Sequence, residues 1–186
     1  MNRHRSLAPL SRDHQPVLQL AEGLKSDGPA TLRSGLPESA EARAAHVLNF
    51  YEEAMRPHFA AEEKVLLPAV RGRDKALDGI IEKVLRDHAE IRSLLDRLRS
   101  GIDTEATFDS LGRALERHVR LEERELFERI QQVVPLDVLD EMAPRLEEAT
   151  LAGAGPDERD SNHEGGRASP SKRAGERRTK RPTDSG

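Results

Sequence analysis

One short pattern occurs twice in this 186-residue chain and constrains its fold more than any other feature. A histidine is followed four residues later by a glutamate at His58 and Glu62, and again at His118 and Glu122. Residues four apart lie on the same face of an α-helix, so each copy presents an imidazole and a carboxylate to one neighbour. Apolar residues recur at helical spacing around both copies, which predicts that both pairs face the core.

The burial of these pairs limits what the chain can be. A buried carboxylate without a partner is costly, whereas imidazole nitrogen and carboxylate oxygen are ligands that suit iron, manganese or zinc. A metal cluster is therefore the simplest partner for the duplicated pairs. The alternative is a purely structural bundle, because a single histidine on an apolar face is more often a hydrogen-bonded core residue than a ligand.

The duplication extends beyond these two helices. Arg12-Asp13-His14 recurs as Arg86-Asp87-His88, and the apolar residues that follow each copy match in position. Each half of the chain therefore reads as a helical hairpin that offers a histidine from its first helix and a His/Glu pair from its second. Two such hairpins packed antiparallel form a four-helix bundle. The predicted metal ligands are the six residues that would converge in its core: His14, His58, Glu62, His88, His118 and Glu122.

The composition favours an all-α fold. Charged residues make up 34% of the chain and aromatic residues only 3%, whereas strands favour aromatic and β-branched residues. Hydrophobic periodicity predicts four long helices and a short extra C-terminal helix, over about 10–25, 38–70, 75–99, 104–132 and 136–149.

Prolines and polar residues predict the details of the first half. Ser11 or Asp13 is expected to cap the first helix, which would put Pro16 in its first turn and His14 near its start. The glycines and prolines of residues 26–38 predict a loop. Pro57, inside the second predicted helix, is expected to kink it or to break one backbone hydrogen bond.

The folded domain is expected to cover residues 1–152, and the character of the chain changes from about Gly153. Large apolar residues vanish there, so residues 153–186 are predicted to be a disordered tail. Residues 167–186 hold seven Lys and Arg against two Asp and Glu. A solubilising end is the simpler interpretation of this basic stretch, and contact with nucleic acid or an acidic partner is the alternative.

The absence of cysteine excludes disulfides, thiolate zinc sites and iron–sulfur clusters, and it leaves nitrogen and oxygen ligands for any metal. The N-terminus lacks the apolar core of a signal peptide, and no apolar run approaches the length of a membrane span. We therefore expect a cytoplasmic protein with no membrane partner. A net charge of −4 indicates no nucleic-acid partner for the folded domain.

At these histidines and glutamates the sequence resembles the hemerythrin-like family, specifically its HHE cation-binding branch, over roughly residues 10–132. The resemblance implies two non-haem iron ions, bridged by an oxo or hydroxo group, in an up-down-up-down bundle. Oxygen-carrying hemerythrins place another histidine four residues after the third-helix histidine, where this chain has Arg92. They also carry aspartate one residue after the position of Glu122, where this chain has Glu123. Both departures argue against reversible oxygen carriage.

Four imidazoles and two bridging carboxylates do not fill the coordination of two octahedral metals, so positions remain for a small ligand. The predicted function is a di-iron protein that reacts with oxygen, peroxide or nitric oxide, as in oxidative or nitrosative stress. A non-enzymatic iron or gas sensor and an iron store or donor stay open as alternatives, and so does the question of enzymatic activity.

Several charged residues lie close in sequence to the predicted ligands, and each has more than one possible role. Arg92 could stabilise a bound anion if it reaches the site, and a surface position is the alternative. Glu63, Glu123 and Glu125 are expected to be surface groups or neighbours of the ligands rather than ligands.

Overall fold

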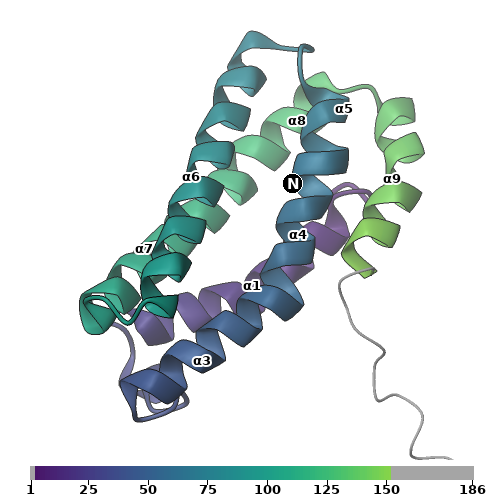
Figure 1. Cartoon of the computed structure of the whole chain (residues 1–186). Coiled ribbons are helices and arrows are strands. Elements are labelled where there is room, and N and C mark those ends of the chain that lie inside the picture. The colour runs from purple at the N-terminus through teal and green to yellow at the C-terminus, as the bar shows by residue number, and fades with distance from the viewer. Residues whose placement is uncertain (1–2, 152–186) are drawn as a thin grey trace, which may run out of the picture. The chain divides into compact units, whose positions relative to one another are not determined.

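The computed structural model describes residues 3–151, and every regular element in that range is a helix, as predicted (Figure 1). In chain order, with η marking a π-helical turn, the elements are α1 (Ala8–Leu24), α2 (Ala30–Arg33), α3 (Ala40–Phe50), η1 (Tyr51–Met55), α4 (Arg56–Ala61), η2 (Glu62–Leu66), α5 (Leu67–Val70), α6 (Lys75–Arg99), α7 (Thr104–Leu121), η3 (Glu122–Leu126), α8 (Phe127–Val133) and α9 (Leu136–Leu151).

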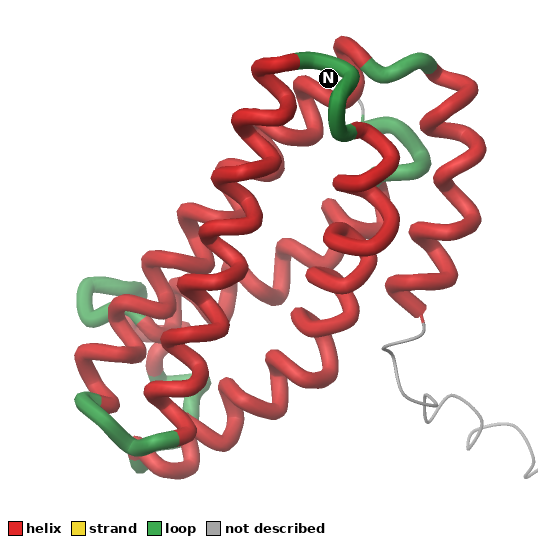
Figure 2. The backbone as a smooth tube through the Cα atoms, turned by 45° about the horizontal axis from the view of Figure 1, so that its top comes forward, coloured by secondary structure: helices red, strands yellow, loops and turns green. Residues whose placement is uncertain are grey.

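These elements make four long helical rods and one shorter helix. The stretch from α3 to α5 is one continuous rod, α7 to α8 is another, and α1 and α6 are the remaining two (Figures 1 and 2). Along its length α7 packs against both α1 and α6, while α9 packs against α4 and η2. No helix among residues 3–151 combines the length and apolar character that a membrane crossing requires. The cytoplasmic location stays a prediction.

Local chemistry explains where the rods begin and end. The side chain of Asp74 accepts a hydrogen bond from the backbone N–H of Leu77 at 2.9 Å, which caps the start of α6. Ser39 caps α3 in the same way, through the N–H of Ala42 at 3.1 Å. After α6 the chain turns at Gly101, whose φ of +66° is a left-handed conformation that glycine adopts without strain.

The first helix begins earlier than the sequence predicts. It starts at Ala8 with Pro9 in its first turn, and no side chain caps it. Leu7 and Leu10 are both fully buried. Their contact with the core extends the helix toward the N-terminus, because helical stability in proteins comes mainly from packing of the apolar face.

Two further expectations for the first half were therefore wrong. Neither Ser11 nor Asp13 caps α1; Pro16 lies in the helix interior, and His14 lies in the middle of the helix instead of near its start. The segment predicted to be a loop over 26–38 contains a short helix, α2, which packs against α1.

The break expected at Pro57 takes the form of a π-helical turn. The N–H of Arg56 bonds to the carbonyl of Tyr51, five residues earlier, just before Pro57. A proline has no N–H to offer to the helix, and the wider turn accommodates that missing hydrogen bond.

The buried apolar side chains form two clusters, and each cluster draws on the four long rods. The first includes Val17, Met55, Leu95, Phe108 and Leu115. The second includes Leu10, Leu66, Ile81, Phe127 and Met142, the last of which belongs to α9. Residues 152–186 lie outside the described range, so the predicted disordered tail and the boundary at residue 152 stay predictions.

Candidate metal centre

A layer of buried polar side chains lies where the two apolar clusters meet. In every long rod the sequence passes from one cluster to the other at a histidine or at a His/Glu pair. All six predicted ligands are in this layer and all are buried, with residue exposures from 0 to 4%. They come from four rods: His14 from α1, His58 and Glu62 from α4 and η2, His88 from α6, and His118 and Glu122 from α7 and η3.

The first pair of imidazoles comes from α1 and α4. The Nε2 atoms of His14 and His58 are 3.3 Å apart. His14 Nε2 is 2.9 Å from Glu122 Oε2, and His58 Nε2 is 3.8 Å from the same oxygen. These three residues each offer one atom to a group whose atoms all lie within 4.8 Å of one another, a spacing that fits one metal ion.

The second pair comes from α6 and α7. His88 Nε2 is 3.3 Å from Glu62 Oε2, and His118 Nε2 is 3.3 Å from Glu122 Oε1. Glu62, His88, His118 and Glu122 form a second group within 4.8 Å. The arrangement therefore offers two adjacent ligand groups of imidazole nitrogen and carboxylate oxygen, which suit iron, manganese or zinc.

The two carboxylates lie between the imidazole pairs. Glu122 turns Oε2 toward His14 and Oε1 toward His118. Glu62 turns Oε2 toward His88, while its Oε1 is 3.6 Å from His58 Nε2. Each carboxylate thus has one oxygen on either side, which is the geometry needed to bridge two cations.

The hydrogen bonding of this layer is incomplete without a cation. Within residues 3–151, seven buried side-chain atoms of Glu62, His88, His118 and Glu122 have no hydrogen bond of good geometry. One of them, Glu122 Oε2, has only the close charged contact with His14 Nε2 at 2.9 Å. Leaving such groups unsatisfied in a protein interior costs about 1–3 kcal/mol each, and more when they are charged. All seven lie in the two ligand groups or on their rings, so the residues present fit a metal cluster.

Three of the four imidazoles have a carboxylate on the nitrogen that faces away from the cluster. His14 Nδ1 is 2.7 Å from Glu123, His88 Nδ1 is 2.7 Å from Glu63, and His58 Nδ1 is 3.2 Å from Asp13. Such a partner fixes the tautomer and orientation of a metal-binding histidine. His118 Nδ1 has no such partner within the described residues.

Two arginines hold the outer glutamates in place. Arg92 donates to Glu63 Oε1 at 2.8 Å and lies over the Phe59 ring, with its guanidinium carbon 5.5 Å from the ring centre. Arg3 pairs with Glu123 and lies over Phe127 at 5.1 Å. Arg92 therefore contacts Glu63, the neighbour of His88, from a surface position in which its side chain is 41% exposed. Its guanidinium has no lone pair to give a metal.

The three other glutamates lie where surface groups or neighbours of the predicted ligands are expected. Glu63 and Glu123 are half-buried neighbours of the ligands, while Glu125 is exposed and pairs with Lys83 at 3.2 Å. The sequence signal for the two neighbours was the doubled glutamate in each copy of the pattern. This pattern did not predict which histidine each glutamate contacts. Each contact joins a glutamate of one hairpin to a histidine of the other.

Hydrophobic periodicity did not predict the π-helical turns that begin at both central glutamates. In η2 the N–H of Leu67 bonds to the carbonyl of Glu62, and in η3 the N–H of Phe127 bonds to that of Glu122. Each such turn holds one residue more than an α-turn, which rotates the following side chains by about 100° around the axis. Pro68, two residues after the first turn, could have signalled it, but the second turn contains no proline and none directly follows it.

The electrostatics of the layer differ between the imidazoles. Burial alone would lower the pKa of His14, but its contacts with Glu122 and Glu123 raise it to about 9. Burial would also lower the pKa values of His58 and His88. Nearby carboxylates outweigh this and raise them to about 10 and about 9, respectively. Burial lowers the pKa of His118 to about 3, and the attraction of Glu122 is too weak to offset it. A cation must displace protons from this layer, so its affinity falls as pH falls.

The glutamates differ in the same way. Burial and the charge of Glu122 raise the pKa of Glu62. Burial would also raise the pKa of Glu122, but the surrounding imidazoles hold it well below its usual range. Glu122 is therefore the more strongly ionised carboxylate between the two imidazole pairs.

A family model for the hemerythrin HHE cation binding domain matches residues 5–130. The match covers more than half of the 186 residues, and the chain belongs to the hemerythrin HHE cation-binding family, as its resemblance predicted. No curated protein and no solved structure matches it. The family and the clustered His and Glu side chains make this a candidate cation-binding protein, with iron the typical cation.

Proposed function

We propose that this chain binds two non-haem iron ions in the core of an up-down-up-down antiparallel four-helix bundle and reacts there with small ligands such as oxygen, peroxide or nitric oxide. The proposed ligands are His14 and His58 for one ion, His88 and His118 for the other, and Glu62 and Glu122 between them. The observation that carries the proposal is the set of seven polar atoms buried in this layer without a hydrogen bond of good geometry.

The residues around the cluster would bind and orient it. The Nε2 atoms face inward, while Glu123, Glu63 and Asp13 face three of the Nδ1 atoms and hold those rings in one tautomer. When bound, two iron ions supply sites for electron transfer and for small ligands. The apolar clusters on both sides of the layer keep bulk water away from it.

Two aromatic rings add to this exclusion. Phe59 stacks on His88 with ring centres 3.8 Å apart, and Phe127 lies parallel to His14 at 5.7 Å. Both phenylalanines are nearly fully buried. They cover the imidazoles on the solvent side. They also fix the orientation of the imidazole rings, and so the direction in which the nitrogen lone pairs point.

The position of Arg92 supports reactivity over reversible oxygen carriage. It stands four residues after His88, where oxygen carriers have a further imidazole, and it is bound to Glu63 instead. Because the Arg92 guanidinium has no lone pair, a cation beside His88 and His118 would receive no fifth imidazole there and could take an exogenous ligand. A cluster held by these residues would therefore supply reactivity with small ligands instead of reversible oxygen carriage.

The test is to load the full chain with iron(II) without oxygen, then add peroxide or nitric oxide and record the optical spectrum. The proposal expects new charge-transfer bands in wild type and little change in Glu122→Gln. A chain that takes up iron but shows no spectral response to either ligand would contradict the small-ligand chemistry and favour an iron store. Oxygen binding that is reversible over many cycles would contradict it in another way.

A further inference from the structure

The internal duplication predicts a hydrogen bond that the structure does not contain. Asp13 and Asp87 occupy the same position in the two Arg-Asp-His copies, and His58 and His118 occupy the same position in the two His-x-x-x-Glu copies. In the first half, Asp13 Oδ2 is 3.2 Å from His58 Nδ1. The equivalent pair in the second half would be Asp87 and His118, yet His118 Nδ1 is buried without a partner within residues 3–151.

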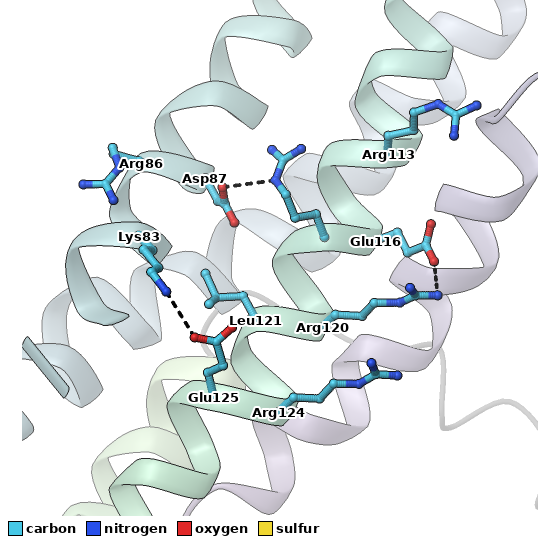
Figure 3. Close-up of a pocket in the computed structure, with 10 residues that line it drawn as sticks. Lys83, Arg86, Asp87, Arg113, Glu116, Arg120, Leu121, Arg124 and Glu125 are labelled. Atoms are coloured by element: carbon cyan, nitrogen blue, oxygen red, sulfur yellow. Dashed lines mark hydrogen bonds and ion pairs between the residues drawn. The ribbon is translucent and has the colours of Figure 1, made fainter. Parts of the chain in front are cut away.

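Asp87 is held by an arginine instead. Its Oδ1 is 3.5 Å from Arg117 Nε, and its side chain is only 13% exposed. Arg117 is itself fixed by a 2.8 Å hydrogen bond to Glu90. Asp87 lines an open cleft of about 570 Å³ between α6 and α7. Figure 3 shows its carboxylate turned toward α7.

A single sequence difference between the halves accounts for this. Position 117 precedes His118 as position 57 precedes His58, and the residue at position 57 is proline. The ring of Pro57 cannot pair with a carboxylate, so Asp13 is left to the imidazole. The guanidinium of Arg117 carries a permanent charge and several donors, so it competes for Asp87.

The other outer contacts are balanced between the two imidazole pairs. Glu123 holds His14 of the first pair and Glu63 holds His88 of the second, both at 2.7 Å, and an arginine supports each glutamate. The difference between the pairs therefore comes down to Asp13 and Asp87. Across metal sites in general, removing such an outer partner of a metal-binding histidine lowers the metal affinity by roughly 10- to 100-fold.

We propose that Arg117 withholds Asp87 from His118, and that the metal position at His88 and His118 is consequently held more weakly than the position at His14 and His58. This inference rests on the proposed two-metal site. Neither Arg117 nor Asp87 belongs to the ligand groups, and Arg117 acts on the site only by holding Asp87 away from His118.

The experiment uses the full chain loaded with cobalt(II), a redox-stable probe, and follows cobalt absorbance after a large excess of chelator is added. Wild type is expected to release its metal in two phases of equal amplitude. In Arg117→Leu, Asp87 is free to reach His118, and the fast phase should slow by roughly 10- to 100-fold. Arg117→Gln, which keeps a polar side chain without the charge, should slow it as well.

Three controls isolate the role of Asp87. Arg117→Leu combined with Asp87→Asn should release metal at the wild-type rates, and Asp87→Asn alone should change neither phase. Arg120→Leu removes a neighbouring arginine that pairs with Glu116 instead, and it should also change nothing. Asp13→Asn should accelerate the slow phase toward the fast one.

Release in a single phase from wild type, or a slower fast phase that persists in the Arg117→Leu, Asp87→Asn double variant, would overturn the inference. So would unchanged release from both Arg117 variants while circular dichroism shows normal helix content. If two cobalt ions are bound per chain, none of these results contradicts the proposed function. Fewer than two cobalt ions bound to wild type would contradict the proposed function itself.

Discussion

The two halves of the chain, residues 8–70 and 75–133, present the same ligand types but support them differently. Each offers a histidine from its first long helix and a His/Glu pair from its second, and all six side chains are buried. The halves diverge in the residues just outside: Asp13 contacts an imidazole, whereas its counterpart Asp87 contacts Arg117. The two halves therefore match in the six predicted ligands and differ in the residues that contact those ligands.

Some similarities between the halves arise from different parts of the sequence. The arginine that supports Glu63 is Arg92, one turn after His88 on the same helix. The arginine that supports Glu123 is Arg3, which precedes α1 and has no counterpart in the repeat. Both lie over a phenylalanine ring that faces the imidazole of a predicted ligand. The same arrangement of Arg, Glu and His is thus built twice from unrelated positions.

The largest expected effect separates the two central glutamates. Glu122 belongs to both ligand groups, whereas Glu62 belongs to the group of His88 and His118 alone. Glu122→Gln should reduce the iron retained after desalting to about half of the wild-type amount, because His14 and His58 lose the carboxylate oxygen 2.9 Å from His14 and keep only Glu62 Oε1, which is 3.6 Å from His58. Glu62→Gln leaves three ligands for each ion and should retain more. Equal losses in the two variants, measured by iron analysis, would show that the glutamates are equivalent.

Metal removal should destabilise the two halves together, since the cluster joins them. A ligand that binds only the folded state at 100 times its Kd stabilises it by about 2.7 kcal/mol per site. Thermal unfolding of the chelator-treated chain should therefore begin at a clearly lower temperature than that of the loaded chain. The Glu122→Gln variant should gain less from added metal. Identical melting curves for the wild-type apo and loaded chains would mean that the six residues do not form a strong site.

The outer glutamates offer a matched comparison between the halves. Glu63→Gln should weaken metal binding at the His88 side, and Glu123→Gln at the His14 side, each by roughly 10- to 100-fold. Chelator competition measures both affinities. Glu125→Gln is the control, because Glu125 is exposed and pairs with Lys83. A loss in the control as large as in the other two would point to a general charge effect.

The smallest expected effect lies at the turn that joins the halves. Asp74 caps α6 and pairs with Arg129 of α8 at 2.8 Å, and Arg129 lowers the pKa of Asp74 to about 2. A lowered folded-state pKa means that the ionised form stabilises the fold above the unfolded pKa near 3.8, and that this contribution is lost as pH falls toward 2. Asp74→Asn keeps a good cap but removes the charge.

The variant should therefore melt slightly below wild type at pH 6, with the difference closing between about pH 4 and pH 2. Melting temperatures of both proteins across this range measure it. A difference that is constant down to pH 2 would assign the effect to the cap instead of the ion pair.

Helical periodicity predicted what depends on residues close in sequence. It indicated an all-helical fold, its four long rods, and the six residues that the structure brings together, because spacings of three and four residues report which side chains share a face. It misplaced the start of α1, where burial of Leu7 and Leu10 decides the boundary instead of a polar cap.

What periodicity could not predict depends on contacts between distant residues. Arg3 meets Glu123 across 120 positions, and Glu123 meets His14 across 109. The loss of an outer partner at His118 likewise needed the contact between Asp87 and Arg117 on different helices. No proline near Glu122 indicates the π-helical turn that begins there, and nothing in the local sequence explains it.

The most direct test of the two-metal claim is an anomalous difference map, collected at the iron absorption edge, from a crystal of the iron-loaded chain. The account predicts two peaks in the buried layer, one beside His14 and His58 and one beside His88 and His118, with Glu122 between them. A single peak, or no peak within reach of these six side chains, would contradict it.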